Sequence, residues 1–587
     1  MIGPARLFRV FHEQQIKHTK EEHKDMKVVI VGGVAGGATA AARIRRLNEK
    51  AEIIVFERSG YISYANCGLP YYIGDIIKDP DALTLQTPES FYSRFRVNMK
   101  VHHEVTAIHP HKKTVSVCNL ENGEIFEESY DKLLLSPGAR PTQPKLPGIG
   151  IRQVFTLRTV EDTFHIKEYI NTHQPRSVIL AGGGFISLEL AENLRKLGVE
   201  VTIVQRPKHL MNPFDPDMAS FIHNEMRRHG IKLLLGHTVE GFGEKDGQAE
   251  VLLKDAPPLH GDMVILAIGV TPDTQLAKTA GLSLGIKDSI LVNDRMETSI
   301  PDIYAVGDAV QVKHYVTGQD AMISLAGPAN KQGRIAADNI CGGDSRYQGS
   351  LGSSVIKIFD LTAASTGINE ATAKRSGIDA DKVILSPMSH AGYYPGGKLM
   401  TMKILFEKET YRLLGAQIIG YEGVDKRIDV LATSIHAGLK ATELKDLDLA
   451  YAPPYSSAKD PVNMAGFMIS NLSEGVLRQF HLEDMDSLPL DGSVTLLDTR
   501  TPGEYAQGHI DGFLNIPVDE LREHIQEIPK DKPVYVICQS GLRSYIACRI
   551  LSGYGFTCFN FSGGFRLYSS VMHDRRLAET ASVCGMD

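Results

Sequence analysis

Two stretches of the chain repeat one order of hydrophobic and polar positions. Each begins with an unbroken apolar run, Lys27–Val31 in the first and Ser177–Ala181 in the second, and continues through a glycine-rich turn into a helical pattern and another apolar run. Continuous apolar runs of this length are typical of parallel strands buried on both faces. The pattern therefore predicts strand, glycine turn, helix and strand, the order of a dinucleotide-binding unit, twice in the chain.

The first glycine turn covers residues 32–37, and the strand that follows its helix ends at Glu57. Glycines there let backbone N–H groups approach a pyrophosphate at the helix N-terminus, and an acid at the strand end accepts hydrogen bonds from a ribose. Val34 stands where the usual fingerprint has its middle glycine, so a turn that serves only helix–strand packing is the alternative. The expected nucleotide-binding residues are Gly32, Gly33, Gly37, Glu57 and Arg58.

The second glycine turn has no acid at the end of its second strand, where Gln205 and Arg206 stand instead. An acid favours a free ribose 2′-hydroxyl, whereas a nearby arginine can hold a 2′-phosphate. This unit therefore leaves NADH and NADPH both open. The residues expected to bind this second nucleotide are Gly182, Gly184, Gln205 and Arg206, and Ser187 replaces the third glycine.

Three further segments with strand-and-turn character lie at 133–141, 264–274 and 298–309. Asp308 follows an apolar run and a glycine, a place suited to binding a ribityl chain or a pyrophosphate. The order and spacing of these segments favour a binding role over plain strand-and-turn structure. Their candidate cofactor-binding residues are Ser136, Gly138, Gly269, Gly307 and Asp308.

Cys67 lies in the small-residue loop SYANCGLP, and the next cysteine in the sequence is Cys118. A dithiol redox site would need a closer partner. The loop itself has no lysine or arginine to favour a thiolate, so activation has to come from a helix terminus, a cofactor or a bound substrate. A buried, inert cysteine is the alternative.

A second candidate cysteine, Cys538, ends the apolar run 533–537 and starts a tight loop before a helical pattern. Successive N–H groups of such a loop can form an anion-binding concavity that stabilises a thiolate and then a persulfide, and Arg543 adds positive charge. A buried strand-terminal cysteine is the alternative. The loop residues are Gln539, Ser540, Gly541, Leu542 and Arg543.

Size and charge restrict the remaining classes. A chain of 587 residues is too long for one hydrophobic core, so several domains are expected. The net charge of −7 and the absence of basic blocks argue against nucleic-acid binding, and no apolar window is long enough for a membrane span. Seven scattered cysteines do not suggest a disulfide framework, and a reducing cytoplasm is the simplest compartment. We expect no metal site.

Residues 26–470 resemble the FAD-dependent pyridine nucleotide–disulfide oxidoreductases. The stretches GGVAGGATAAARIRRL, SYANCGLPYYIG, HAGYYPGG, EGVDKRIDV and AYAPPYSSAKDPVN are similar to those of coenzyme A-disulfide reductases. Residues 487–580 resemble a single rhodanese domain through DTR, EY, GHI, N-IP and C-x-x-G-x-R. Fusions of this kind include NADH-dependent persulfide reductases.

The resemblance implies an α/β fold with Rossmann-like FAD and NAD(P)H domains, an α+β dimerisation domain and a C-terminal α/β rhodanese domain. The segment before the first strand is read as an N-terminal extension. The expected divisions are the extension at 1–25, the FAD-binding domain at 26–148 and 270–345, the NAD(P)H-binding domain at 149–269, the dimerisation domain at 346–470, a linker at 471–486 and the rhodanese domain at 487–587.

The resemblance also implies that the missing partner of Cys67 is the thiol of coenzyme A, held as a mixed disulfide. Tyr393 and Tyr451 match tyrosines that reach this thiol from the other subunit of a homodimer; ordinary packing is their alternative. The residues that match contacts to CoA are Thr39, Arg43, Arg46, Ser63, Asn66 and Lys459. For those on the first helix, a solvated cationic face is the alternative.

The function implied is reduction of CoA disulfide, CoA persulfide and polysulfide sulfur by NAD(P)H through FAD. Cys67 and CoA carry the exchange, and Cys538 presents sulfane sulfur, so that sulfide or free CoA thiol is released. One alternative is a disulfide reductase with a passive rhodanese appendage. Another is an NADH oxidase or peroxidase that uses a cysteine sulfenic acid, although the first glycine turn lacks the histidine of those enzymes. A sulfur-carrier or redox-sensing module is the non-catalytic alternative.

Overall fold

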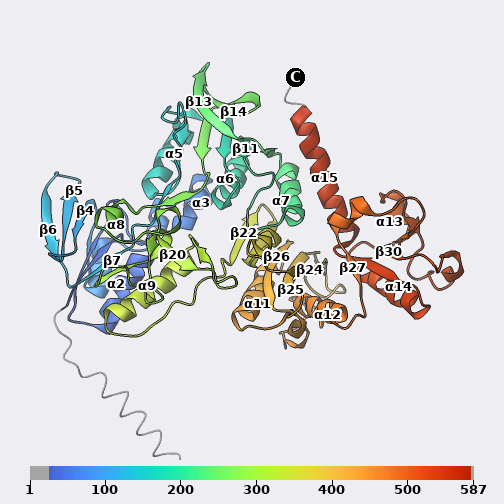
Figure 1. Ribbon diagram of the computed structural model, residues 1–587. Coiled ribbons are helices and arrows are strands. Elements are labelled where there is room, and N and C mark those ends of the chain that lie inside the picture. Colours follow the sequence, from blue (N-terminus) through green and yellow to red (C-terminus); the bar gives the residue numbers. More distant parts are fainter. Residues whose placement is uncertain (1–25, 584–587) are drawn as a thin grey trace, which may run out of the picture.

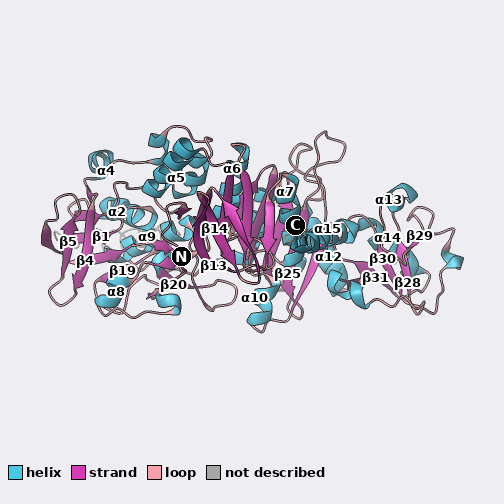
Figure 2. Cartoon of the chain, turned by 90° about the horizontal axis from the view of Figure 1, so that it is seen from above, coloured by secondary structure: helices cyan, strands magenta, loops and turns pink. Residues whose placement is uncertain are grey.

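The computed structural model describes residues 26–583, so the extension expected at 1–25 lies outside the described residues. The molecule is elongated, with the first dinucleotide unit at one end and the C-terminal α/β domain at the other (Figure 1). The second dinucleotide unit and an antiparallel sheet lie between them, and the view from above shows the same order (Figure 2). Within residues 26–583, the helices are too short or too polar to cross a membrane.

The first dinucleotide unit is a five-stranded parallel sheet assembled from two separate parts of the chain. Its strand order is β19-β7-β1-β2-β3. Strand β19 comes from a part of the chain that follows the whole second unit. Alternate residues of β1 are buried on opposite faces: Val28 and Ile30 against the helices, Val29 against the small antiparallel sheet. The strands are β1 (Lys27–Val31), β2 (Glu52–Phe56), β3 (Asn98–Lys100), β7 (Lys132–Leu135) and β19 (Ile303–Ala305); the helices are α2 (Ala35–Leu47), α3 (Leu69–Ile73), α4 (Pro88–Phe95), α8 (Gln275–Thr279) and α9 (Ala326–Ile340).

Smaller antiparallel pieces extend this unit and connect it to the second. Strands β8 (Ala139–Pro141) and β17 (Val270–Pro272) pair with each other at the two crossings between the units. The other strands of this region are β4 (His103–His109), β5 (Thr114–Asn119), β6 (Ile125–Ser129), β18 (Ile290–Leu291), β20 (Val310–Lys313) and β21 (Asp320–Ala321).

The second unit repeats the parallel arrangement in the order β12-β11-β10-β16-β9. Its sheet is covered on one face by helices and on the other by a three-stranded antiparallel sheet. The elements are β9 (Val154–Phe155), α5 (Val160–His173), β10 (Ser177–Ala181), α6 (Phe185–Lys196), β11 (Glu200–Gln205), α7 (Pro216–Arg228), β12 (Lys232–Leu235), β13 (Val239–Lys245), β14 (Gln248–Leu253), β15 (Ala256–Gly261) and β16 (Met263–Leu266).

The third part is a five-stranded antiparallel sheet with an entirely buried central strand, β26. Helices α11 and α12 pack over it through a cluster of aliphatic residues. The elements are β22 (Ser354–Ile358), β23 (Leu361–Gly367), α10 (Glu370–Arg375), β24 (Ala380–Leu385), β25 (Thr401–Glu407), β26 (Leu413–Gly420), α11 (Val424–His436) and α12 (Pro461–Ser473).

The C-terminal domain is a parallel sheet in the order β27-β31-β30-β28-β29. Its first strand lies inside the expected linker 471–486, where Phe480 packs against Tyr535 and Phe561. A two-residue strand is too short to show in a hydrophobic pattern, so the sequence reading missed it. The elements are β27 (Gln479–Phe480), β28 (Thr495–Asp498), α13 (Pro502–Ala506), β29 (Leu514–Asn515), β30 (Val534–Ile537), α14 (Leu542–Gly553), β31 (Cys558–Phe561) and α15 (Gly564–Val583).

Candidate active sites

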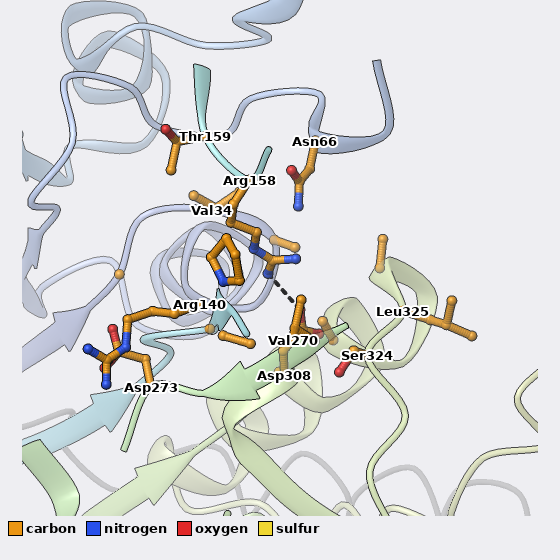
Figure 3. A pocket seen from close by; sticks show the side chains of 18 of the residues that line it. Val34, Asn66, Arg140, Arg158, Thr159, Val270, Asp273, Asp308, Ser324 and Leu325 are labelled. Atoms are coloured by element: carbon orange, nitrogen blue, oxygen red, sulfur yellow. Dashed lines mark hydrogen bonds and ion pairs between the residues drawn. The ribbon is translucent and has the colours of Figure 1, made fainter. Parts of the chain in front are cut away.

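A cavity of about 1460 Å³ lies between the two dinucleotide units, at the carboxyl ends of their parallel strands. Both glycine turns line it, as do the loop with Cys67 and the turn with Asp308. Figure 3 shows that side chains from several separate segments face this cavity. Ligands of open α/β sheets bind at this edge, so the position agrees with a nucleotide site. We call it the shared cavity.

The first glycine turn has no room for side chains where the backbone closes on itself. A Cβ at Gly32 would lie 2.1 Å from the carbonyl oxygen of Ser136, and one at Gly37 would lie 1.9 Å from that of Gly32. Glu57 accepts a hydrogen bond from the N–H of Gly33 at 2.9 Å, so one carboxylate oxygen holds the turn. The turn, Ser136 and Gly138 line the shared cavity together.

Asp308 meets a residue that the sequence reading missed. The guanidinium of Arg158 donates to Asp308 Oδ2 at 2.7 Å, and both side chains face the shared cavity (Figure 3). The N–H of Gly307 donates to Gln332 Oε1 at 2.7 Å, which fixes the turn before Asp308. Arg58, expected to contact a nucleotide, forms an ion pair with Asp273 at 2.9 Å, and both residues line the cavity.

The second glycine turn is equally tight. A Cβ at Gly182, where φ is +117°, would lie 2.2 Å from the carbonyl oxygen of Ala267. Gln205 lines the shared cavity beside this turn, whereas Arg206 is exposed outside the lining. Gly184 is the N-cap of α6, and Gly269 also lines the cavity.

Cys67 is exposed within the shared cavity, so the inert, buried alternative does not describe it. It lies in a single 3₁₀ turn, Asn66–Gly68, and the five residues of α3 that follow are too few to act as a thiolate-stabilising helix. Partial burial, which desolvates the thiol, raises the pKa of Cys67, and the Glu189 carboxylate raises it further, while Arg158 lowers it. A free thiolate here therefore needs help from a bound group. Ser63 and Asn66 line the same wall.

Glu189 is a second residue that the sequence reading missed. It lies on α6, lines the shared cavity, and accepts a hydrogen bond from the Tyr71 hydroxyl at 3.5 Å. Burial raises the pKa of Glu189 to about 7, although the Tyr71 hydrogen bond opposes this shift. In the sequence, the only sign that Glu189 could lie at the cavity was its position in the helix that follows the second glycine turn.

Tyr393 and Tyr451 lie together but not at Cys67. Their hydroxyl groups are 2.6 Å apart, and the hydrogen bond that they share raises the pKa of Tyr451. The two side chains are 75% and 46% exposed, and neither belongs to the shared cavity of the same chain. Lys459 is exposed a few residues after Tyr451. A single chain thus leaves this tyrosine pair open on its surface.

The expected CoA contacts on α2 are in three different settings. Thr39 lines the shared cavity and donates to Asn330 Oδ1 at 2.6 Å. Arg43 forms an ion pair with Asp338 of α9 at 2.7 Å, so much of its charge is balanced within the chain. Arg46 is exposed, with its guanidinium 5.4 Å from the ring centre of Phe95. Only Thr39 of these three reaches the cavity.

Cys538 is fully buried at the end of β30, and its sulfur is surrounded by donors. The N–H of Gly541 lies 3.1 Å from Sγ, and the hydroxyl of Ser544, which the sequence reading missed, lies 3.2 Å from it. Both come from the start of α14, a twelve-residue helix whose N-terminus favours negative charge. The site therefore suits a thiolate or persulfide anion.

Arg543, expected to add positive charge at this loop, is paired with an acid. Its guanidinium forms two hydrogen bonds with Glu504, at 2.6 and 2.7 Å, and these bonds lower the pKa of Glu504 to about 2. The positive charge is therefore largely neutralised inside the domain. Gly541 and Ser544 donate directly to the sulfur, and Arg543 does not.

Comparison with known proteins covers most of the chain. Residues 26–333 match the model for pyridine nucleotide-disulphide oxidoreductase, residues 353–461 match its dimerisation domain, and residues 482–570 match the rhodanese-like domain. A coenzyme A disulfide reductase of Staphylococcus aureus (strain bovine RF122 / ET3-1) is 38% identical over 442 residues, which are 75% of this chain and 99% of that protein.

Two solved structures extend the likeness across the C-terminal domain. The reduced CoADR-RHD of Bacillus anthracis has a TM-score of 0.92 and 47% identity, covering 94% of this chain and all of that one. A NAD-dependent persulfide reductase from A. fulgidus has a TM-score of 0.87 and 36% identity, covering 92% of this chain and all of that one. The expected resemblance and the expected α/β fold class are confirmed.

Proposed function

Because the chain belongs to the pyridine nucleotide-disulphide oxidoreductase family, we propose that it uses NAD(P)H to reduce CoA disulfide, CoA persulfide and polysulfide sulfur. Family membership makes it an oxidoreductase that depends on FAD and NAD(H). The observation that supports the sulfur substrates is Cys67. It is exposed, and it is the one cysteine among the described residues that line the shared cavity. Such a site needs a second thiol from a substrate.

The residues of the shared cavity fit the two nucleotides. A Cβ at Gly32 or Gly182 would collide with a backbone carbonyl, so each turn keeps glycine and lets its backbone close tightly at the cavity, where a pyrophosphate can approach the N–H groups. Bound FAD supplies a carrier for two electrons. We assign FAD to the first turn, with Glu57, Ser136, Gly138, Gly307 and Asp308, and NAD(P)H to the second turn with Gln205.

The sulfur chemistry at Cys67 is thiol–disulfide exchange. The Cys67 thiolate attacks the CoA sulfur of CoA–S–SH, forming a mixed disulfide between Cys67 and CoA and releasing hydrosulfide. Two electrons then regenerate the Cys67 thiolate and CoA–S⁻, which takes up a proton. For each CoA persulfide and NAD(P)H with one proton, the products are CoA–SH, hydrogen sulfide and NAD(P)⁺.

The exposed tyrosine pair supports a homodimeric site. Tyr393 and Tyr451 share a hydrogen bond, and Tyr394 and Tyr455, each close to one of them in the sequence, are also exposed. Exposed aromatic residues gathered on a dimerisation domain favour burial against a second copy. In the proposed dimer, the pair stands near the Cys67 of the other subunit and supplies a proton to the leaving CoA thiolate.

Cys538 is proposed to hold sulfane sulfur as a persulfide and to pass it to CoA. Gly541 and Ser544 support this role, because they donate to the sulfur whose negative charge must be stabilised. The six free cysteines of the described residues fit a reducing compartment such as the cytoplasm.

The test is Cys67→Ser, assayed for sulfide release from CoA persulfide with NADH. We expect sulfide release to fall to background while NADH still bleaches the flavin absorbance. Cys118→Ser is a matched control, since Cys118 lies on β5 outside the shared cavity, and it should retain full activity. Sulfide release that persists in Cys67→Ser would overturn the mechanism.

One observation favours a second candidate, a disulfide reductase with a passive rhodanese domain. Cys538 is 0% exposed, so a bulky sulfur donor does not reach it in this conformation. Cys538→Ser separates the two candidates. A loss of sulfide production from polysulfide with intact CoA-disulfide reduction supports the proposal, whereas unchanged turnover on both substrates supports the passive domain.

A further inference from the structure

Helix α15 of the C-terminal domain lies beside α7 of the second dinucleotide unit, although the two are far apart in the sequence (Figures 1 and 2). The hydroxyls of Ser570 and Ser220 are 2.8 Å apart, and the Asn224 amide donates to the Ser570 carbonyl at 3.0 Å. Leu567 and Val571 are buried against Ile384 of the antiparallel sheet. The helix is thus fixed to two other parts of the chain by both polar and apolar contacts.

His223 of α7 lies at the centre of this contact and is 1% exposed. Its Nε2 lies 3.0 Å from the backbone nitrogen of Leu210, and its Nδ1 lies 2.7 Å from Asp574 Oδ2 of α15. Because a backbone N–H can only donate, Nε2 has to accept, and the imidazole proton is therefore on Nδ1. The neutral ring donates to Asp574 and accepts from Leu210, and Arg227 also binds Asp574.

Leu210 connects this ring to the shared cavity. A Cβ at Gly183 would lie 2.5 Å from Leu210 Cδ2, so the two residues are in close contact. The next N–H, of Met211, donates to the carbonyl of Gly183 at 2.8 Å, and Met211 has a positive φ of 56°. Backbone in this region persists only where its surroundings hold it. Met211 and the two residues after it line the shared cavity beside the second glycine turn.

We propose that Asp574 and His223 are positioning residues for the NAD(P)H site. Asp574 fixes the orientation and tautomer of His223, and His223 holds the backbone at Leu210, which sets the cavity wall formed by residues 211–213. The C-terminal domain thereby completes the nucleotide site of the same chain. This goes beyond the proposed sulfur chemistry and rests only on the assignment of NAD(P)H to the second glycine turn.

The test compares variants of the full-length holoenzyme at Asp574 with a neighbour on the same helix. Anaerobic flavin reduction is followed by stopped flow at increasing NADPH and, separately, NADH. Asp574→Ala should raise the apparent Kd for the nucleotide about tenfold while the limiting rate stays within about twofold, since the change removes the carboxylate that binds His223 and Arg227 at a place remote from the reacting atoms. Arg575→Ala, an exposed neighbour, should match the unmodified protein.

Rescue separates positioning from general stability. Asp574→Asn keeps an oxygen that accepts from Nδ1–H, so its Kd should return to within about threefold of the unmodified protein, even though the ion pair with Arg227 is lost. Two results overturn the inference: an unchanged Kd in Asp574→Ala, or equal Kd increases in Asp574→Ala and Asp574→Asn. Flavin reduction needs no sulfur acceptor, so failure of the proposed sulfur chemistry would leave this test intact.

Discussion

The ammonium nitrogen of Lys403 lies 3.0 Å from Asp215 Oδ2, and both residues are buried. Asp217 and Glu370 complete a group whose oxygens lie within 4.8 Å of one another, a spacing that could also hold a metal ion. Here Lys403 provides the positive charge. Burial raises the pKa of Asp215, and the ammonium group of Lys403 opposes that shift. The cluster joins the second dinucleotide unit to the antiparallel sheet.

Replacing Lys403 with methionine should strongly destabilise the protein. The change leaves the buried carboxylate of Asp215 without its cation, and breaking one side of a buried ion pair costs about 3–5 kcal/mol. We expect a clear fall in the midpoint of thermal unfolding. Lys408→Met is the control, because Lys408 pairs with Asp379 on the surface, and such pairs contribute about 0–1 kcal/mol. Equal midpoints for the two variants would contradict this account of the cluster.

The proposed dimeric site predicts complementation between two inactive variants. One chain carries Cys67→Ser and the other carries Tyr393→Phe with Tyr451→Phe. If the tyrosines serve the cysteine of the partner subunit, random mixing rebuilds one complete site in each mixed dimer, which gives about a quarter of the original activity. CoA-disulfide reduction after unfolding and refolding the mixture measures this.

The control for complementation places all three substitutions in one chain and mixes it with the Cys67→Ser chain. Neither chain of that mixture keeps Cys67, so the mixture should remain inactive. Activity that stays at the sum of the two separate variants would show that each site is built within one subunit.

Glu189→Gln should shift the titration of Cys67. Since Glu189 has a pKa of about 7, its carboxylate becomes charged above that value and raises the pKa of the thiol. In the variant, the rate of Cys67 alkylation should reach half its maximum at lower pH and lose any inflection near neutral pH. Glu200→Gln, on the exposed edge of β11, should leave the profile unchanged, and an identical profile for Glu189→Gln would refute the coupling.

The same carboxyl group predicts how stability depends on pH. The pKa of Glu189 is raised from 4.5 in the unfolded chain to about 7 in the fold, so the folded state keeps its proton longer. The free energy of unfolding therefore declines as pH rises through this interval. Glu189→Gln removes that decline, and urea unfolding at several pH values shows whether it does.

Nucleotide preference should depend on the end of β11. Gln205→Glu introduces a carboxylate that binds a 2′-hydroxyl and repels a 2′-phosphate, so kcat/KM for NADPH should fall at least about tenfold while that for NADH is retained. Arg206→Ala should lower kcat/KM for NADPH and leave kcat/KM for NADH unchanged. Lys232→Ala, which removes a cation paired with Glu200, should change neither. A parallel loss for both nucleotides would place Gln205 outside the 2′ position.

Local motifs were readable from the sequence because their physical constraint is local. Gly32 and Gly182 must be glycine, since any Cβ would collide with a carbonyl oxygen of the adjoining strand end. The apolar runs of β1 and β10 likewise report burial on both faces. These features located the two dinucleotide turns and the loop of Cys67.

What the sequence did not reveal depends on residues that the fold brings together from distant segments. Arg158 meets Asp308 across 150 positions, and Glu504 neutralises Arg543 across 39. Neither partner carries a local pattern that marks it. The contact of Asp574 with His223 spans 351 positions and depends on how whole domains pack, which no window of sequence contains.

Helix α15 also holds the other sulfur site, since the N–H groups of Phe565 and Arg566 donate to the carbonyls of Cys538 and Gln539. One end of α15 is bonded to the loop of Cys538 and the other end to α7. These contacts hold the C-terminal domain in a fixed position relative to the second dinucleotide unit. Sulfur therefore has to be carried between Cys538 and Cys67 by a small molecule that diffuses. The rate of this transfer should depend on the concentration of that molecule and not on the flexibility of the segment that links the domains.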